Sequence, residues 1–450
     1  MILGWLCCLS GIVQAASISR TDWQVIEGRD PNRLVVKFHE ESHVLAMDAE
    51  PLLSIQPLEF KVEPLFVQEM EWLEKRYRRL HSKNPDIEDL RTYAIITGEE
   101  LALDTIALQL VSDPRIEHIY RDFLPQAPPM DIPPETPDFR PDQLDHQAAP
   151  VGFGFSQTAE WSTGEGIRIA NIEYSFDPLH EDLQNAPVTH AWGWDQDAWH
   201  YHGNAVLGQL IATDNEYGVT GSVSNAEALV VSPYPEEGYY NVAAALVASL
   251  DLLVAGDVVI IEQQTSAFDA YCPIEYIPSV FDAIQWLVAE DLSVVEPSAN
   301  GAHDLDADYW EGWFDLETQD SGAIMVGGSY GLGDLHWSGG SSYGSRMDVQ
   351  GWFDRIVTTS TYEFADLFYP DDSRQAYTAY FGGTSGASPQ IVSVIAAFNS
   401  AVLAQQGQVW GATDLRNLIR QTGRSQPFAD RETWIGSQPN ASTLLRMWAW

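Results

Sequence analysis

The 450-residue sequence predicts an α/β protein. Its main part is expected to be a doubly wound, mainly parallel sheet with helices on both faces, preceded by a small α+β domain. From about residue 160, several strand-length runs are apolar throughout, without the alternation of a half-exposed strand. Such runs are typical of strands that are buried on both faces. Helical stretches lie between them, as a sheet covered by helices requires.

The elements of this larger unit follow one another along residues 146–450. We expect helices at residues 241–253 and 280–290. The expected strands cover residues 167–172, 228–231, 258–261, 292–295 and 323–326.

The first unit, residues 17–125, has a different pattern. Its order of strand, helix, strand, helix, strand suits a small open sandwich of sheet and helices. We expect the strands at residues 33–38, 92–96 and 115–120, and the helices at 69–80 and 102–112.

Residues 126–145 separate the two units. Prolines stand at positions 128, 129, 133, 134, 137 and 141, with little between them that could pack. The segment is predicted to be a semi-extended, exposed linker, which is a favourable place for a protease to cut.

The first 16 residues predict a secretory signal. Residues 2–13 are mostly apolar but too short to span a bilayer, and small residues follow as a cleavage site, although the usual basic residues are missing. The protein is therefore expected outside the cell or in the periplasm. No later stretch is expected to reach transmembrane length. Cys7 and Cys8 would be removed with the signal, which leaves Cys272 as a lone packing residue.

The charge of the chain excludes some partners. It has 65 acidic and 23 basic residues, a formal net charge of -42. Such a surface repels nucleic acid and anionic lipid, so neither is expected to bind. All lysines lie in the first quarter of the chain, at positions 37, 61, 75 and 83.

The strongest motif is Gly-Gly-Thr-Ser-Gly-Ala-Ser-Pro at residues 382–389, before an apolar helix expected at 391–403. Small residues allow a sharp turn and close approach of a substrate, and Pro389 is expected in the first helical turn. Ser385 would stand at a helix N-terminus, where N–H groups favour negative charge on a substrate oxygen. The alternative is a serine that only caps the helix, but the whole string is more specific than that.

This string resembles the nucleophile motif of the subtilisin-like (S8-type) serine peptidases. A second motif, His202-Gly203-Asn204 at the head of a helical stretch, resembles the family's histidine motif, with Asn204 where threonine is usual. The resemblance implies that His202 takes the proton of Ser385 and later donates it to the leaving amine.

The third member of the motif set departs from the family. The family's strand ends in aspartate, whereas here Glu173 stands at that place, in the register set by His-Glu-Asp-Leu at residues 180–183. Glutamate can orient an imidazole, as it does in some α/β-hydrolases. Asp177 is the nearest alternative, and a degenerate, inactive site is the other.

Asn300 in Pro-Ser-Ala-Asn-Gly, residues 297–301, resembles the asparagine whose amide helps to bind the oxyanion. A turn asparagine is the alternative. The acid, histidine, asparagine and serine segments occur in the family's chain order across residues 160–400, which favours the resemblance more than any single motif.

By pattern and position, the first unit resembles the family's inhibitory propeptide. The resemblance implies a zymogen that its own propeptide inhibits intramolecularly and that processes itself near the linker. Protein or peptide substrates are the other expected partners, and the mature enzyme is expected to be a monomer.

Two other classes remain open. Serine-carboxyl peptidases (sedolisins) share the fold but replace both the histidine and the asparagine, so His202 and Asn300 argue against them. A secreted pseudoprotease that binds peptides without cleaving them is supported only by Glu173.

Specificity and metals are less determined. Glu262 and Glu296 end two strands that border the pocket for the residue before the cut in the family, and a basic residue would be preferred if they point into the cleft. The alternative, which is the commoner role of glutamates at strand ends, is a hydrogen-bonded scaffold residue. No cofactor is expected for the chemistry. Structural calcium is common in the family, and acidic runs at residues 304–308 and 371–372 could bind it, but no ligand is assigned.

Overall fold

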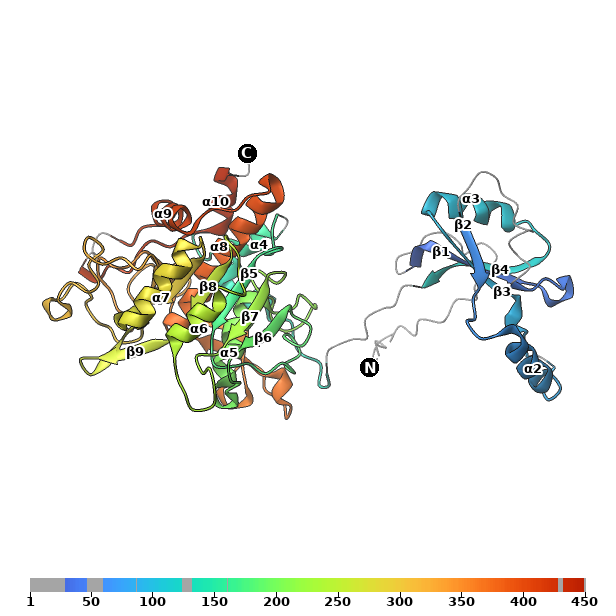
Figure 1. Cartoon of the computed structure of the whole chain (residues 1–450), viewed down its shortest axis with the longest axis horizontal. Coiled ribbons are helices and arrows are strands. Elements are labelled where there is room, and N and C mark those ends of the chain that lie inside the picture. Colours follow the sequence, from blue (N-terminus) through green and yellow to red (C-terminus); the bar gives the residue numbers. More distant parts are fainter. Residues whose placement is uncertain are drawn as a thin grey trace, which may run out of the picture. The chain divides into compact units, whose positions relative to one another are not determined.

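The structure is a computed structural model that describes residues 29–46, 60–85, 87–123, 132–159, 161–427 and 432–448. The expected signal segment, with Cys7 and Cys8, lies outside the described residues. The chain divides into two compact units, Met1–Pro129 and Met130–Trp450, which are described separately below (Figure 1).

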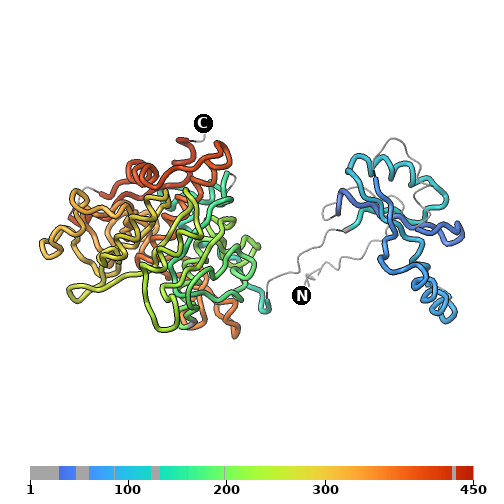
Figure 2. Tube along the Cα trace, viewed as in Figure 1, coloured from blue at the N-terminus to red at the C-terminus, as the bar shows by residue number. Residues whose placement is uncertain are grey.

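The N-terminal unit is a four-stranded antiparallel sheet with two helices, and Figure 2 traces its path in blue. The strand order is β2-β3-β1-β4. Helix α3 packs on the sheet through an apolar core that includes Leu103 and Ile106. The elements are β1 (Arg29–Phe38), β2 (Phe60–Pro64), α2 (Met70–His81), β3 (Tyr93–Gly98), α3 (Glu100–Leu110) and β4 (Ile116–Phe123).

Strand β2 was not predicted from the sequence. It is short, lies at the edge of the sheet, ends in Pro64, and none of its residues is fully buried. An edge strand with one exposed face has few apolar residues, so it carries a weak sequence signal.

The larger unit is built on a seven-stranded sheet in which every pairing is parallel. Its order is β13-β12-β11-β8-β5-β7-β6, so the predicted doubly wound fold class is confirmed. The two edge strands, β6 and β13, are the ones that sequence reasoning missed. The strands are β5 (Arg168–Ile172), β6 (Val188–Trp192), β7 (Glu227–Val231), β8 (Val258–Ile261), β11 (Ser293–Pro297), β12 (Ile324–Ser329) and β13 (Val349–Trp352).

Helices cover both faces of this sheet (Figure 1). One face is covered by α5 (His200–Ile211) and α8 (Thr384–Gln406), and α10 (Ala441–Trp448) packs on α8. The other is covered by α6 (Val242–Ser249) and α7 (Pro278–Ala289). The remaining helices are α4 (Phe155–Thr158) and α9 (Ala412–Thr422).

Two hairpins and several single turns complete the chain. The hairpins are β9 (Gln264–Ala267) with β10 (Ala270–Pro273), and β14 (Ile356–Thr359) with β15 (Tyr377–Phe381). The 3-10 turns are η1 (Glu40–Ser42), η3 (Leu90–Thr92), η4 (Arg140–Asp142), η5 (Leu144–His146), η6 (Asp197–Trp199), η7 (Ile274–Tyr276), η8 (Asp308–Trp310), η9 (Tyr362–Phe364) and η10 (Ser373–Gln375).

The second half of the expected linker is only partly exposed: its prolines are exposed, whereas Thr136, Phe139, Gln143 and Asp145 are buried. Residues 126–131 lie outside the described residues, but from Ile132 onward the segment packs on the larger unit. Gln375 Nε2 donates to the Ile132 and Pro134 carbonyls (2.5 and 2.7 Å), and the Phe139 ring is buried. Backbone carbonyls of this proline-rich segment thus accept hydrogen bonds from a glutamine far away in the sequence. The composition of the segment itself gives no sign of this partner.

Helix α8 corrects two expectations. It begins at Thr384, not at residue 391, so Pro389 lies inside the helix and has no N–H to donate to the Ser385 carbonyl one turn earlier. Its length and composition also satisfy the criteria for a membrane span, which the sequence was expected to lack after its first residues. Its apolar window is 89% buried, so it is the core helix of this unit.

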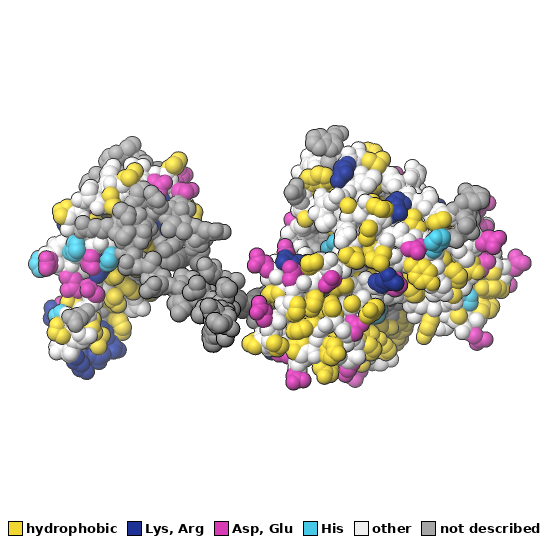
Figure 3. All heavy atoms as spheres, turned by 180° about the vertical axis from the view of Figure 1, so that it is seen from behind, with side chains coloured by type: hydrophobic (Ala, Val, Ile, Leu, Met, Phe, Trp, Pro, Cys, Tyr) yellow, Lys and Arg dark blue, Asp and Glu magenta, His cyan; other side chains and the backbone are white. Residues whose placement is uncertain are grey.

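Surface charge is distributed unevenly. Figure 3 shows acidic and hydrophobic side chains spread over the viewed face of the larger unit, with few basic ones between them. On the N-terminal unit, the basic residues Arg78, Arg79 and His81 lie in the last turn of α2.

Candidate active site

Side chains at the carboxyl ends of three adjacent strands meet the start of α8. Glu173 follows β5, Glu262 follows β8, and Asn300 follows β11. In parallel sheets, this edge is where reactive groups collect. A pocket of about 350 Å³ lies there, lined by Tyr174, Trp199, Tyr201, His202, Glu262, Gln263, Gln264, Tyr271, Pro297, Asn300, Thr384 and Ser385.

Glu173 and His202 form a buried pair. The His202 Nδ1–H donates to Glu173 Oε2 (2.5 Å), and Glu173 Oε1 accepts from the Tyr174 N–H (2.8 Å). Burial favours the neutral imidazole, but Glu173, with a smaller contribution from Glu262, outweighs it and raises the pKa of His202 to about 9. Because Nδ1 is occupied, Nε2 is the ring nitrogen left for chemistry in the pocket.

Glycine after the histidine allows this pairing. A Cβ at Gly203 would lie 1.8 Å from the Ser175 carbonyl oxygen, so only glycine lets α5 approach the loop after β5 so closely. Asn204 then fastens the two segments: its Oδ1 accepts from the Asp177 N–H (2.8 Å), and its Nδ2 donates to the Ser360 carbonyl (3.0 Å).

The hydrogen bonds of Asp177, the alternative residue for orienting the imidazole, differ from those of Glu173. The Asp177 carboxylate accepts from the Leu179 N–H (2.9 Å), whereas Glu173 is the carboxylate bonded to His202. The structure therefore places Glu173 at the imidazole, as the register of the sequence predicts.

Ser385 lies at the start of α8 and lines the same pocket as His202. The helix is preceded by Gly383, whose φ of 75° is readily adopted only by glycine. The first N–H groups of a helix have no partner within the helix, so the Ser385 N–H is directed to whatever lies at its N-terminus.

Asn300 is held by the residue before the serine. Its Oδ1 accepts from both the Thr384 N–H (2.9 Å) and the Thr384 hydroxyl (3.2 Å). The Asn300 N–H in turn donates to Gln264 Oε1 (3.0 Å). With the oxygen fixed in this way, the Nδ2 group is the part of the amide left to donate. A substrate oxygen between this group and the Ser385 N–H would receive two hydrogen bonds.

Glu262 is the one of the two strand-end glutamates that lies beside these groups. It lines the pocket although the residue is only 5% exposed. Neither carboxyl oxygen is within ordinary hydrogen-bond distance of a partner in the described part of the chain. Burial, reinforced by Glu173, raises its pKa to about 8, against the opposing influence of His202 and of the nearby Ser385 hydroxyl.

Glu296 does not line the cleft, and the scaffold role that the sequence also allowed applies to it. It is fully buried, and its Oε1 accepts from the Glu275 N–H (2.9 Å). Pro297 takes its place in the pocket lining. Glu296 faces a cluster of charged side chains behind the strand and has a scaffold role.

Aromatic side chains form much of the pocket, and sequence reasoning missed them. Tyr174 and Tyr201 follow and precede the motif residues Glu173 and His202, and the Tyr174 and Trp199 rings lie 5.5 Å apart. Adjacency to motif residues was the available signal. Tyr271 comes from the β9–β10 hairpin, which no motif marks.

Carboxylates of both acidic runs accept hydrogen bonds from within the chain. Asp306 accepts from the Ser345 N–H and hydroxyl, and Asp372 is bonded to Arg374. No group of three or more His, Cys, Asp or Glu residues suited to a metal exists within the described ranges. Cys272 is buried in an apolar cluster, where burial raises the pKa of its thiol to about 12, as a packing residue requires.

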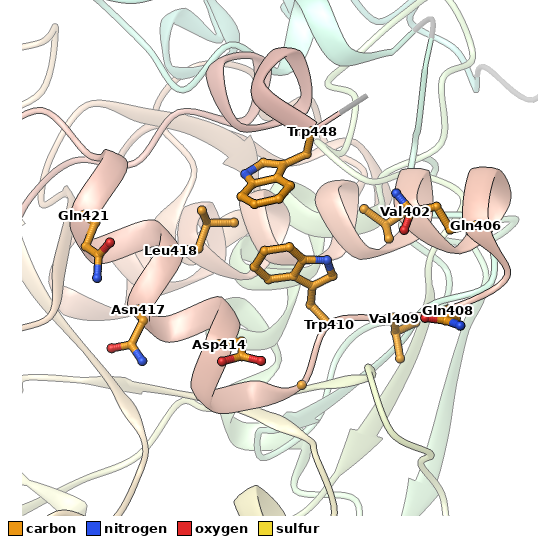
Figure 4. Close-up of a pocket in the computed structure, with 11 residues that line it drawn as sticks. Val402, Gln406, Gln408, Val409, Trp410, Asp414, Asn417, Leu418, Gln421 and Trp448 are labelled. Carbon is orange, nitrogen blue, oxygen red and sulfur yellow. The ribbon is translucent and has the colours of Figure 1, made fainter. Parts of the chain in front are cut away.

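A second hollow lies away from these residues, between α8, α9 and α10 (Figure 4). Its volume is about 560 Å³, and the rings of Trp410 and Trp448 lie 4.7 Å apart in it. Its lining combines these rings with exposed carboxamides such as Asn417 and Gln421. It contains no histidine, serine or cysteine, so it offers no nucleophile and base.

Comparison with known proteins identifies the fold. No protein-family model matches the sequence, and no curated protein matches it. Among solved structures, a lanthipeptide protease has 16% identity and a TM-score of 0.52 over 68% of this chain and 95% of its own. The PatG macrocyclase in complex with peptide has 14% identity and a TM-score of 0.50, over 69% and 98%. Fervidolysin from Fervidobacterium pennivorans, a keratinolytic enzyme related to subtilisin, has 17% identity and a TM-score of 0.50, over 94% and 62%.

At such identities the likeness concerns the fold. This chain has the subtilisin-like α/β fold, with a small antiparallel domain before it.

Proposed function

We propose that this chain is a secreted, subtilisin-like serine endopeptidase that is made as a zymogen. The observation that carries the proposal is the arrangement around one pocket. His202, Ser385 and Asn300 line it, and the buried Glu173 is bonded to the far side of the imidazole. The subtilisin-like fold supports the same activity, since its solved examples include proteases.

In the proposed reaction, Ser385 Oγ attacks the carbonyl carbon of a peptide bond while His202 Nε2 takes the hydroxyl proton. The tetrahedral intermediate then collapses, the C–N bond breaks, and the proton passes from His202 to the leaving amine. Water, deprotonated by His202, attacks the acyl-enzyme and releases the acid and the free serine.

Glu173 has two tasks in this scheme. Its bond to Nδ1 holds the tautomer that leaves Nε2 free to accept a proton, and its negative charge stabilises the imidazolium that forms. Because only the neutral imidazole can accept the proton, activity should rise with pH toward the pKa of His202, about 9.

The negative charge on the substrate oxygen would be stabilised by two donors. The Asn300 amide is fixed by Thr384, and the Ser385 N–H stands at the positive end of α8. Neither donor has to reorganise during the reaction, which is why such preformed donors are effective.

The N-terminal unit is proposed to be the inhibitory propeptide of this enzyme, and residues 1–16 its secretory signal. The support is the position of the unit before the catalytic unit and its compact sheet with two helices. In the zymogen, cleavage is expected near residues 126–131, between the unit boundary and the segment that packs on the larger unit.

Labelling with a fluorophosphonate probe tests the activity directly. We expect wild-type protein to be labelled and Ser385→Ala to be neither labelled nor active, with kcat falling by about 10⁶-fold. Ser266→Ala, in the exposed part of the β9–β10 hairpin, is the matched control and should be labelled normally. Wild-type protein that binds peptides but is not labelled would indicate a pseudoprotease instead.

Mass spectrometry of the exported wild-type and Ser385→Ala proteins tests maturation. Self-processing predicts removal of the N-terminal unit from the wild-type protein only. Loss of that unit from both proteins would contradict self-processing.

A further inference from the structure

We propose that Glu262 is the specificity residue of this peptidase and receives the Lys or Arg side chain of the residue whose carbonyl Ser385 attacks. The inference rests on the proposed function and adds a substrate class to it, namely basic peptides.

The first argument is the state of the carboxyl. Glu262 is 5% exposed, and neither oxygen has a hydrogen-bond partner at ordinary distance among the residues described. Buried polar groups are normally bonded, since an unsatisfied one costs about 1–3 kcal/mol. A group left unpartnered inside a substrate pocket is explained if the substrate supplies the partner.

The second argument is that the pocket supplies no cation of its own. Its lining contains neither lysine nor arginine. His202 is the one residue of this lining that can become a cation, but its imidazole is already paired with Glu173 through Nδ1. The complementary charge for Glu262 must therefore come from outside the pocket.

The third argument is the chemistry of the other walls. Tyr174, Tyr201, Tyr271 and Trp199 present aromatic rings, which attract cations, and Gln263 and Gln264 add carboxamides. A guanidinium or ammonium group needs an acidic acceptor, polarisable walls and neutral acceptors, and this pocket offers all three. For an anionic side chain the lining offers neither lysine nor arginine.

The fourth argument is position. Ser385 and Asn300, which are proposed to act on the reacting carbonyl, line the same hollow as Glu262. The side chain nearest to Glu262 is therefore the one that belongs to the attacked carbonyl. The pocket volume of about 350 Å³ is within the range of sites that enclose a ligand group. The net charge of -42 would also draw basic peptides toward the molecule.

The titration of the site is consistent with this use. Glu262 faces Glu173, His202 and Ser385, and in the empty pocket burial holds its pKa at about 8, so the carboxyl is mainly protonated at pH 7. A substrate cation favours the carboxylate, so binding would release the Glu262 proton to the solvent. Affinity for basic substrates should therefore rise with pH between 7 and 8.

The test uses matched fluorogenic peptides that differ only in having Arg, Lys or Met before the cleaved bond. The processed wild-type enzyme is expected to prefer Arg and Lys over Met by about 10²-fold in kcat/KM, because removing one partner of a buried charge pair is costly. In Glu262→Gln this preference, measured as the ratio of kcat/KM for the Arg and Met peptides within the same variant, should fall to about one. Glu262→Asp should keep part of the preference.

Glu236→Gln is the matched control, because Glu236 is exposed in the loop after β7 and should leave the preference unchanged. Inhibition of the wild-type enzyme by benzamidine, an arginine-like cation, needs no variant and should be competitive. Equal cleavage of all three peptides, an unchanged preference in Glu262→Gln, or no effect of benzamidine would overturn the inference. Absence of both labelling and cleavage would instead contradict the proposed function.

Discussion

The ends of two neighbouring strands, β8 and β11, place buried glutamates in opposite circumstances. Glu296, in β11, is absent from the pocket lining, and its Oε1 accepts a hydrogen bond from the Glu275 N–H, although its Oε2 has no partner in the described structure. Glu262, just after β8, faces the pocket and has no such bond in the described structure. Burial raises the pKa of both carboxyls.

The difference between the two lies in what surrounds them. Near Glu296, Arg346 donates to both oxygens of Glu275 (2.7 and 2.9 Å) and to Asp348 (3.1 Å), so charges are balanced within the chain. Near Glu262, by contrast, the pocket lining contains no arginine or lysine to balance its charge. A raised pKa alone therefore does not distinguish scaffold from site, whereas the absence of a partner beside a nucleophile does.

A third glutamate, Glu173 after β5, provides the sharpest test of how such a carboxyl is used. Replacement by Gln is expected to lower kcat by about 10⁴-fold. The reason is that an amide can donate to Nδ1 and stabilise the wrong imidazole tautomer, with Nε2 already protonated. Steady-state kinetics with one peptide substrate measures the loss.

Glu173→Asp is the companion variant. It keeps the charge but shortens the side chain, and a misplacement of about 1 Å can cost 10²-fold. It should therefore be clearly more active than Glu173→Gln. Equal activity of the two variants would mean that Glu173 is not the orienting group.

The second prediction concerns stability against pH at Glu262. Its pKa is raised from 4.5 to about 8 on folding, so its contribution to stability is fully present below pH 4.5 and is lost as pH rises through 8. Gln at this position does not titrate. Relative to wild type, Glu262→Gln should gain stability across this window, by up to about 1.4 kcal/mol per pH unit.

Denaturant unfolding of both proteins at pH 4.5, 6 and 8 measures this difference. In the Glu236→Gln variant the free energy of unfolding should change with pH as it does in wild type, because the replaced Glu236 side chain is exposed. If the free energy of unfolding of Glu262→Gln also changed with pH as it does in wild type, Glu262 would not titrate differently from an ordinary carboxyl, and the contrast between the ends of β8 and β11 would be wrong.

The segments that carry the proposed catalytic residues could be found from the sequence because their chemistry is local. The turn before Ser385 needs small residues, and the step from His202 into its helix needs Gly203, where a Cβ would lie 1.8 Å from a carbonyl oxygen. Buried parallel strands are equally recognisable, because they are apolar on both faces. The acid at position 173 followed from the register of one strand.

What the sequence did not predict depends on contacts between distant segments. Glu262 and Glu296 each end a run of apolar residues. Only the fold shows that Glu296 lies beside the buried charges around Arg346 and that Glu262 lines the pocket. The packing of residues 132–145 likewise depends on Gln375, more than 200 positions away. Edge strands β6 and β13 were missed because their residues are not uniformly apolar: Thr189 and His190 interrupt β6, and Gln350 and Gly351 interrupt β13, which is nevertheless fully buried.

The third prediction tests the scaffold side of the comparison. Arg346→Met would leave Glu275 and Asp348 buried without their cation, which is expected to cost about 3–5 kcal/mol of unfolding free energy. Arg355→Met is the control, because the Arg355 side chain is 58% exposed and its ion pair is long (3.7 Å), so about 0–1 kcal/mol is expected. Similar losses in the two variants would show that the cluster near Glu296 does not stabilise the fold.

The fourth prediction returns to the end of β11, where Asn300 follows the scaffold glutamate by four positions. Because Thr384 fixes its oxygen, the Asn300 amide is set to donate to the substrate oxygen. Asn300→Ala should lower kcat by about 10²–10³-fold, equivalent to roughly 2.7–4 kcal/mol, with little change in KM, because this bond forms mainly in the transition state. Asn225→Ala, at an exposed turn, should be fully active. A rise in KM at constant kcat would show instead that Asn300 binds the ground state, and β11 would then contribute only scaffold to the site.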